Sequence, residues 1–168
     1  MSLRAQRGNP EKQKNKNMTK IALFNPEMAG NVGSIIRSCA CFGADLHIIE
    51  PCGFPFDINR VRRSAMDYID HVKITRHNDF EAFYESVVLS GDNTGRQKRL
   101  ILATTKGTTD YRKVEYSDSD IIIFGNEGSG FPAEFLDKID QKITISMKNE
   151  MRSLNLAVSC AIILAFAT

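Results

Sequence analysis

Three segments of the chain combine glycines with polar or charged side chains of the kind that bind ligands: residues 25–37, 125–131 and 147–155. In the first, Arg37 carries a guanidinium that can grip a phosphate through two parallel hydrogen bonds, a contact for which lysine is less well shaped. We expect Asn31 just ahead of a helix over residues 34–42, and Arg37 about one turn into it. A structural alternative stays open, in which Asn31 only caps the helix and Arg37 pairs with a surface carboxylate.

The second segment, Gly125-Asn-Glu-Gly-Ser-Gly130, follows an apolar run and precedes Phe131-Pro132, where a helix can open. Glycines in such a turn let a ligand approach the backbone. The spacing is not G-x-G-x-x-G, no acidic residue ends a following strand, and the Lys-Ser/Thr pair of a phosphate loop is lacking. These features argue against an NAD-dependent oxidoreductase or a triphosphate site, and leave a small-molecule loop or a plain tight turn.

The third segment leads into a helix that is apolar on most of its faces and must therefore be buried. Ser153 and Asn155 stand at the mouth of this helix. They could contact a ligand, and they could equally serve as N-capping groups.

Apolar runs bounded by glycine, proline and polar residues place each of these segments after a β-strand. We expect strands at residues 21–24, 46–49, 72–75, 100–103, 120–124 and 142–146, and helices at 34–42, 59–68, 79–88, 132–136 and from about 153. This alternation is typical of an α/β domain with a parallel sheet. Because ligand sites of such sheets collect at the carboxyl ends of the strands, the three segments should meet at one edge.

The chain divides into a short basic end and one domain. The first 20 residues hold six Lys or Arg and a single Glu, without apolar periodicity, so we predict a disordered basic extension over residues 1–18. Such an end is often merely solvated. The remaining residues, 19–168, have the length of one domain with its own core.

The cysteines and histidines do not show the spacing of a metal site. The four cysteines form no C-x-x-C pair and the three histidines no H-E-x-x-H motif, so we expect buried reduced thiols and no metal. No apolar run reaches 18 residues and no signal-peptide pattern opens the chain, which predicts a soluble, cytoplasmic protein without a membrane partner.

Taken together, the three segments resemble the motifs of the SpoU/TrmH branch of the SPOUT methyltransferases. The motifs stand here as Asn31-Val-Gly-Ser-Ile-Ile-Arg37, Gly125-Asn-Glu-Gly-Ser-Gly130 and Ser153-Leu-Asn155. Three further stretches are similar to the single-domain tRNA (cytidine/uridine-34)-2′-O-methyltransferases of this branch: Leu46–Pro51, Asp67-Tyr68 and Thr104–Gly107. The resemblance implies a parallel-sheet SPOUT fold with a C-terminal deep trefoil knot, and a homodimer formed through the knot region.

The resemblance also implies an activity and its residues. The chain would transfer a methyl group from S-adenosylmethionine to a ribose 2′-hydroxyl of tRNA, at nucleotide 34. Arg37 would assist deprotonation of the hydroxyl or contact the neighbouring phosphate; the phosphate contact suits an arginine, which is almost always protonated. Asn31 would orient Arg37, while Ser153 and Asn155 would position the ribose or the donor. The expected donor-binding residues are Ala103, Gly125, Glu127, Ile145, Ser153 and Leu154.

A cluster of basic residues supplies a candidate surface for RNA. Its arginines are Arg60, Arg62, Arg63 and Arg76, and backbone phosphates are their natural partners. A solvated helix face with local ion pairs is the alternative. Two other functions also stay open: a non-catalytic RNA-binding protein on the same scaffold, and methylation of another position in tRNA or rRNA.

Overall fold

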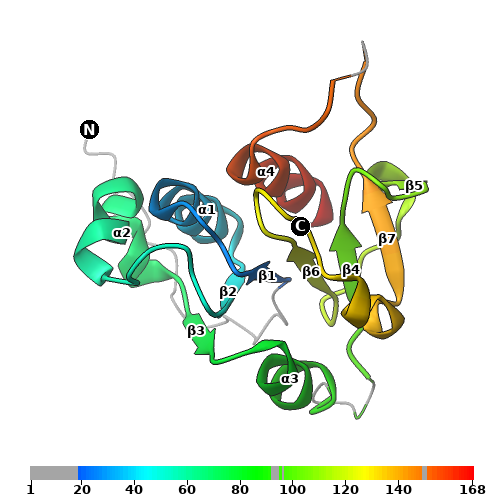
Figure 1. Ribbon diagram of the computed structural model, residues 1–168, viewed down its shortest axis with the longest axis horizontal. Coiled ribbons are helices and arrows are strands. Elements are labelled where there is room, and N and C mark those ends of the chain that lie inside the picture. Colours follow the sequence, from blue (N-terminus) through cyan, green and yellow to red (C-terminus); the bar gives the residue numbers. More distant parts are fainter. Residues whose placement is uncertain (1–18, 92–94, 96, 149–150) are drawn as a thin grey trace, which may run out of the picture.

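Seven parallel strands form one sheet in the order β3-β2-β1-β6-β4-β7-β5 (Figure 1). The structure is a computed structural model, and it describes residues 19–91, 95, 97–148 and 151–168. The strands are β1 (Lys20–Phe24), β2 (Asp45–Ile49), β3 (Ile74–His77), β4 (Leu100–Ala103), β5 (Thr109–Asp110), β6 (Ile121–Phe124) and β7 (Gln141–Thr144). The predicted α/β class with a parallel sheet is confirmed.

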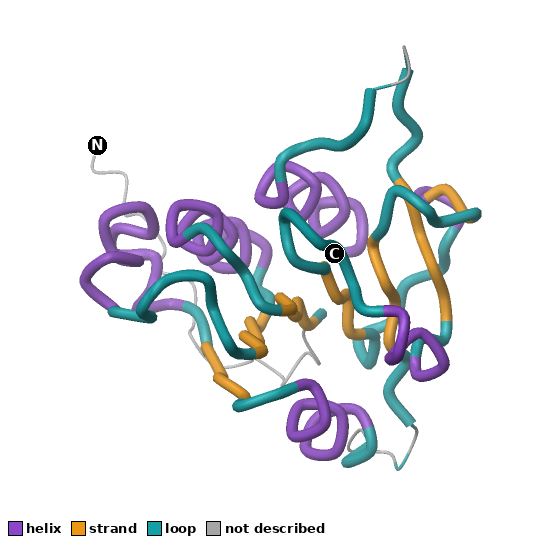
Figure 2. The backbone as a smooth tube through the Cα atoms, in the orientation of Figure 1, coloured by secondary structure: helices purple, strands orange, loops and turns teal. Residues whose placement is uncertain are grey.

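Helices flank this sheet on both faces, as the purple segments around the orange strands in Figure 2 show. The α-helices are α1 (Ala29–Phe42), α2 (Ile58–Ala65), α3 (Phe80–Phe83) and α4 (Leu156–Ala167). Shorter helical turns are η1 (Met66–His71), η2 (Tyr84–Val88), η3 (Tyr111–Lys113) and η4 (Ala133–Lys138). Helix α1 packs against α2, η1 and α4.

Alternating strand residues divide the core into two clusters, one on each face of the sheet. Ile21 and Leu23 of β1 join the cluster that contains α1 and α4, whereas Ala22 and Phe24 join the cluster that contains α3. Successive side chains of a strand point to opposite faces, so every central strand must be apolar along its whole length. This is why the run Ile121–Phe124 is buried throughout.

Several predicted boundaries were wrong. Helix α1 begins at Ala29, five residues before the predicted start, which puts Asn31 inside the helix rather than ahead of it. Arg37 therefore lies more than two turns into α1 instead of about one. The helix expected over residues 59–68 ends at Ala65 and continues as η1, and the last helix starts at Leu156 rather than near Ser153. The two-residue strand β5 was not predicted.

The glycine of the first motif permits close packing of two helices. A Cβ atom on Gly33 would lie 2.3 Å from the Cβ of Ser64, far inside any tolerable contact. Gly33 is fully buried where α2 crosses α1. The same glycine therefore sets the position of α2 and of η1, which follows it directly.

Residues 1–18, predicted as a disordered basic extension, lie outside the described part of the chain. The division into an extension and a domain over residues 19–168 stays a prediction.

Candidate active site

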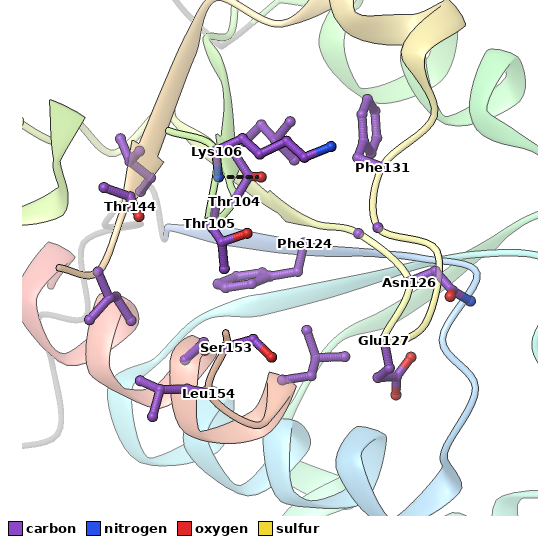
Figure 3. Close-up of a pocket in the computed structure, with 18 of the residues that line it drawn as sticks. Thr104, Thr105, Lys106, Phe124, Asn126, Glu127, Phe131, Thr144, Ser153 and Leu154 are labelled. Carbon is purple, nitrogen blue, oxygen red and sulfur yellow. Dashed lines mark hydrogen bonds between the residues drawn. The ribbon is translucent and has the colours of Figure 1, made fainter. Parts of the chain in front are cut away.

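A cavity of about 770 Å³ lies at the carboxyl ends of β4, β6 and β7 and at the entrance to α4. In Figure 3, Phe124 lies across its middle, Thr105 and Ser153 face it from two sides, and Glu127 stands on the loop that follows β6. All six predicted donor-binding residues line it, together with Asn31 and Asn155. The second and third segments and the start of α1, which belongs to the first segment, therefore meet at one edge of the sheet, as predicted.

The loop after β6 is a tight turn closed by its own backbone. Asn126 and Gly130 exchange two backbone hydrogen bonds of 3.0 Å. The Asn126 side-chain oxygen accepts from the N–H groups of Gly128 and Ser129, at 2.9 and 2.8 Å. A Cβ on Gly125 would lie 2.5 Å from the carbonyl carbon of Gly130, so only glycine fits where the turn closes.

The carboxylate of Glu127 in this turn holds the start of α1. It accepts hydrogen bonds from the backbone N–H of Glu27 at 2.8 Å and of Met28 at 3.3 Å. It also accepts one from Nδ2 of Asn31 at 3.0 Å. Met28, the N-cap residue of α1, forms no side-chain cap of its own, so a carboxylate from a distant part of the chain supplies the acceptor. The alternative in which Asn31 caps α1 is wrong.

Asn31 also bonds to Asn155, at the start of the last helix, α4. Because its Nδ2 donates to Glu127, its Oδ1 accepts from Nδ2 of Asn155 at 3.0 Å. Asn155 in turn caps α4, accepting from the backbone N–H of Ala157 at 2.9 Å and of Val158 at 3.3 Å. The capping alternative for Asn155 holds, and the same side chain also faces the cavity. The chain Glu127–Asn31–Asn155 thus joins all three motifs.

The cavity is lined by both apolar and charged side chains. Its apolar lining includes Leu102, Phe124, Leu136, Ile143, Leu156 and Ile163. Its charged side chains are Lys106, Lys142, Arg152 and Glu127. Since Glu127 is engaged by three donors, the free charge of the lining is positive. Such a cavity suits a ligand with an apolar ring system and a carboxylate or phosphate near its mouth.

Arg37 does not line the cavity. It is exposed on α1, and its guanidinium carbon lies 5.4 Å from the ring centroid of Tyr68 in η1. It forms no ion pair among the described residues, so the alternative of a surface carboxylate partner is wrong for this part of the chain. The hydrogen bonds of the Asn31 side chain go to Glu127 and Asn155, not to Arg37.

The predicted RNA-binding arginines differ in their engagement. Arg62 is paired with Asp70 at 3.1 Å, and Arg76 pairs with Glu50 while lying 4.6 Å from the ring centroid of Phe56. The pairs of Arg62 and Arg76 match the alternative of local ion pairing. Arg60 and Arg63 are exposed on α2, and no ion pair of the described residues includes them.

The cysteines do not line this cavity. Burial raises the pKa of Cys39 to about 12 and that of Cys52 to about 11, so both stay protonated at neutral pH and are poor nucleophiles. Cys41 is exposed, against the expectation of buried thiols. Within the described ranges, no group of three or more His, Cys, Asp or Glu side chains could hold a metal ion. Of the described helices, none combines the length and apolar character that crossing a membrane would need.

Comparison with known proteins gives the geometry its context. The SpoU rRNA Methylase family matches residues 18–165. The chain belongs to the SpoU methylase family. The resemblance drawn from the three motifs is therefore confirmed.

Three relatives of this SpoU chain cover most of its length. The tRNA (cytidine(34)-2'-O)-methyltransferase of Escherichia coli (strain K12) is 42% identical over 148 residues, which are 87% of this chain and 89% of the relative. A solved structure concerned with the 2-OH methylation of C/U34 on tRNA matches with a TM-score of 0.80 and 31% identity, over 89% and 93% of the two chains. An AdoMet-bound rRNA methyltransferase from Sinorhizobium meliloti matches with a TM-score of 0.79 and 27% identity, over 96% of this chain and 60% of that one.

Sequence reasoning missed part of the lining of the SpoU cavity. Thr104, Thr105 and Lys106 follow β4 and face the cavity, and the backbone N–H of Lys106 donates to Oγ1 of Thr104 at 3.2 Å (Figure 3). The signal was available, because this polar stretch also stands at the carboxyl end of a buried strand. Phe131 lines the cavity too, and its aromatic contacts with Phe24 could not be read from spacing.

Proposed function

We propose that this chain transfers a methyl group from S-adenosylmethionine to the ribose 2′-hydroxyl of tRNA nucleotide 34, a cytidine or a uridine. The observation that carries the proposal is the cavity built from all three family motifs. It is found in a chain 42% identical, over 148 residues, to a tRNA (cytidine(34)-2'-O)-methyltransferase. The proposal places the protein in the cytoplasm with its substrate.

The residues of the cavity fit S-adenosylmethionine. The volume of about 770 Å³ lies within the range of cofactor pockets, roughly 300–1,000 Å³. Apolar side chains such as Ile143 and Ile163 would hold an adenine ring, and the backbone at Ala103, Gly125 and Ile145, which also line the cavity, would supply its hydrogen bonds. Ser153 and Leu154 line the cavity beside them. When bound, this group supplies an activated methyl on a sulfonium.

In this proposal the protein aligns the hydroxyl and helps it lose its proton. The reaction is an in-line displacement, so the main contribution of the side chains is to hold the ribose oxygen in the orientation that the displacement requires. Ser153 at the cavity rim is placed to contact the ribose or the donor. Asn31 and Asn155 hold the α1 and α4 ends in register rather than orienting Arg37. Arg37 contacts the phosphate next to the target ribose and assists deprotonation through it.

A homodimer would bring Arg37 into the reaction. Arg37 lies outside the cavity of its own chain, whereas α4 exposes Val158 and Phe166, 47% and 48% accessible, with Leu154 next to it at 39%. These apolar side chains, beside the cavity, suit contact with a second copy. We propose that the chains pair here and that Arg37 of one serves the cavity of the other.

The proposal includes the C-terminal trefoil knot expected from the resemblance. Two features support it: β6 is inserted between β1 and β4, and the connection after β4 approaches β7 very closely. A Cβ on Gly107 would lie 2.5 Å from the backbone of Ile143, so glycine is required where these segments touch.

For RNA we assign the phosphate contacts of α2 to Arg60 and Arg63, since Arg62 and Arg76 are already paired.

Incubation with bulk tRNA and methyl-labelled S-adenosylmethionine, followed by nuclease digestion and mass spectrometry of the nucleosides, tests the proposal. Labelled 2′-O-methylcytidine or 2′-O-methyluridine, strongly reduced in Arg37→Ala, is the expected result. Mass spectrometry of ribonuclease oligonucleotides from the same tRNA locates the label; label at a tRNA position other than 34, or transfer to rRNA in a parallel reaction, would overturn the assignment to nucleotide 34. Binding of tRNA without any transfer would identify a non-catalytic RNA-binding protein instead.

A further inference from the structure

Arg37 contacts an aromatic ring and forms no ion pair among the described residues, whereas Arg76 and Arg112 contact a ring and are ion-paired as well. Four other arginines of the described chain end in ion pairs with carboxylates: Arg62, Arg76, Arg99 and Arg112. Arg37 lies over the ring of the half-buried Tyr68, 5.4 Å from its centroid, and forms no such pair. An aromatic face holds this guanidinium in place of a carboxylate.

The difference has a chemical consequence. A carboxylate occupies two N–H groups of the guanidinium fork and neutralises its charge, as Asp120 does for Arg99 through bonds of 3.0 and 2.6 Å. An aromatic ring attracts the cation through the face of its π-system, and the N–H donors remain available. A guanidinium held in this way is oriented yet still able to grip an anionic group with two hydrogen bonds.

The backbone delivers Tyr68 to Arg37 by a fixed route. Gly33 admits α2 into close contact with α1, and the chain then turns at Met66, whose φ of 58° and ψ of −140° separate α2 from η1. Ala65 and Ile69, on either side of this turn and of Tyr68, are buried in the core cluster that includes α1. The backbone on both sides of Tyr68 is therefore anchored in the core.

We propose that Tyr68 is a positioning residue for methyl transfer. Its ring holds the Arg37 guanidinium in a fixed orientation without neutralising its charge, so that the guanidinium can bind the tRNA phosphate next to the target ribose. This rests on the proposed function, and it gives the Asp67-Tyr68 stretch a role within it. Tyr68 acts through Arg37 and contacts no reactant. The aromatic ring is the required feature, and the hydroxyl is dispensable.

Kinetics of Tyr68→Leu and Tyr68→Phe test the assignment, with tRNA as variable substrate. Tyr68→Leu should lower kcat about fivefold, in keeping with the energy of a partly exposed cation–π contact, and leave the KM for tRNA unchanged. Tyr68→Phe should stay within about twofold of the parent, because it keeps the ring. In single-turnover reactions the Leu change should have no further effect once Arg37→Ala is present.

Tyr84 supplies a matched control. It is also half-buried and carries a cation, Nζ of Lys138 at 4.7 Å from its ring centroid, but it belongs to η2 and does not line the cavity. Tyr84→Leu should leave kcat unchanged, whatever it does to thermal stability. An unchanged kcat in Tyr68→Leu, a loss equal to that of Tyr84→Leu, or a raised KM with constant kcat would each overturn the inference. A parent protein without transferase activity would instead refute the proposed function.

Discussion

Replacing Glu127 by glutamine tests the connection between the three motifs. The Glu127 carboxylate faces only donors: the backbone N–H groups of Glu27 and Met28 and the Nδ2 of Asn31, at 2.8, 3.3 and 3.0 Å. A glutamine amide keeps the shape but has a single acceptor oxygen, and its NH₂ must point at one of these donors. The substitution therefore removes at least one charge-assisted hydrogen bond. It also sets the glutamine NH₂, a donor, against one of the three N–H donors.

The size of the loss follows from these contacts. A hydrogen bond to a charged group contributes about 1.5–3 kcal/mol to stability, and less where water reaches it. The Glu127 contacts are partly accessible, so we expect Glu127→Gln to lower the free energy of unfolding by about 1–2 kcal/mol. Orientation of the Asn31 amide is lost as well, because only the carboxylate forces Nδ2 toward the loop after β6.

Urea-induced unfolding at one fixed protein concentration measures this loss, since a dimer would make stability depend on concentration. The midpoint should fall while the slope stays constant. Glu134→Gln is the control: Glu134 is exposed in η4 and forms no hydrogen bond or ion pair among the described residues, so its loss should stay within about 0.5 kcal/mol. Equal midpoints for the parent protein and Glu127→Gln would refute the assigned role of the carboxylate.

Two further substitutions test the fold. Burial, and then the neighbouring His77, lower the pKa of His47 to about 3, so its contribution to stability is complete above pH 6.5 and is lost as the pH falls towards 3. The free energy of unfolding should therefore fall between pH 7.5 and pH 5.0, and in His47→Gln this fall should be smaller by about 2 kcal/mol. A fall of the same size in both proteins would contradict the lowered pKa of His47. Gly33→Ala should destabilise by about 1–3 kcal/mol through its clash with Ser64, whereas Gly30→Ala in the same helix should cost nothing; equal melting temperatures of the two variants would exclude the crossing as the cause.

The sheet was predictable because its strands carry their own signal. Runs such as Ile121–Phe124 are apolar throughout, as burial on both faces requires. Boundaries failed where the decisive contact comes from far along the chain. The start of α1 has no local cap, since its acceptor is a carboxylate one hundred residues later. The strand β5 is only two residues long and exists through its pairing with β7, which no local pattern reveals.

The members of the site were predictable in part, and its connections were not. The resemblance identified the six expected donor-binding residues, which line the cavity, but it did not place residues 104–106 among them, and Arg37 lies outside the cavity. Spacing could not show that Asn31 bonds Asn155 rather than Arg37, because that depends on the rotation of α1 against α4. Nor could it show which arginines are already paired, as Arg62 and Arg76 are.

The polarity of the hydrogen bonds explains why these motifs need their residue types. Asn31 must donate to a carboxylate on one side and accept from an amide on the other, and only a neutral amide side chain of this length does both. An aspartate there would set two carboxylates against each other. Asn155 must donate to Asn31 while its oxygen caps α4, so it too requires an amide. Each motif on its own is compatible with a cap or a turn. The hydrogen bonds of Glu127, Asn31 and Asn155 join the loop after β6 to the N-terminal ends of α1 and α4. A substitution at any one of the three should therefore disturb the whole network at the cavity, and the free-energy changes of single and double substitutions should not add.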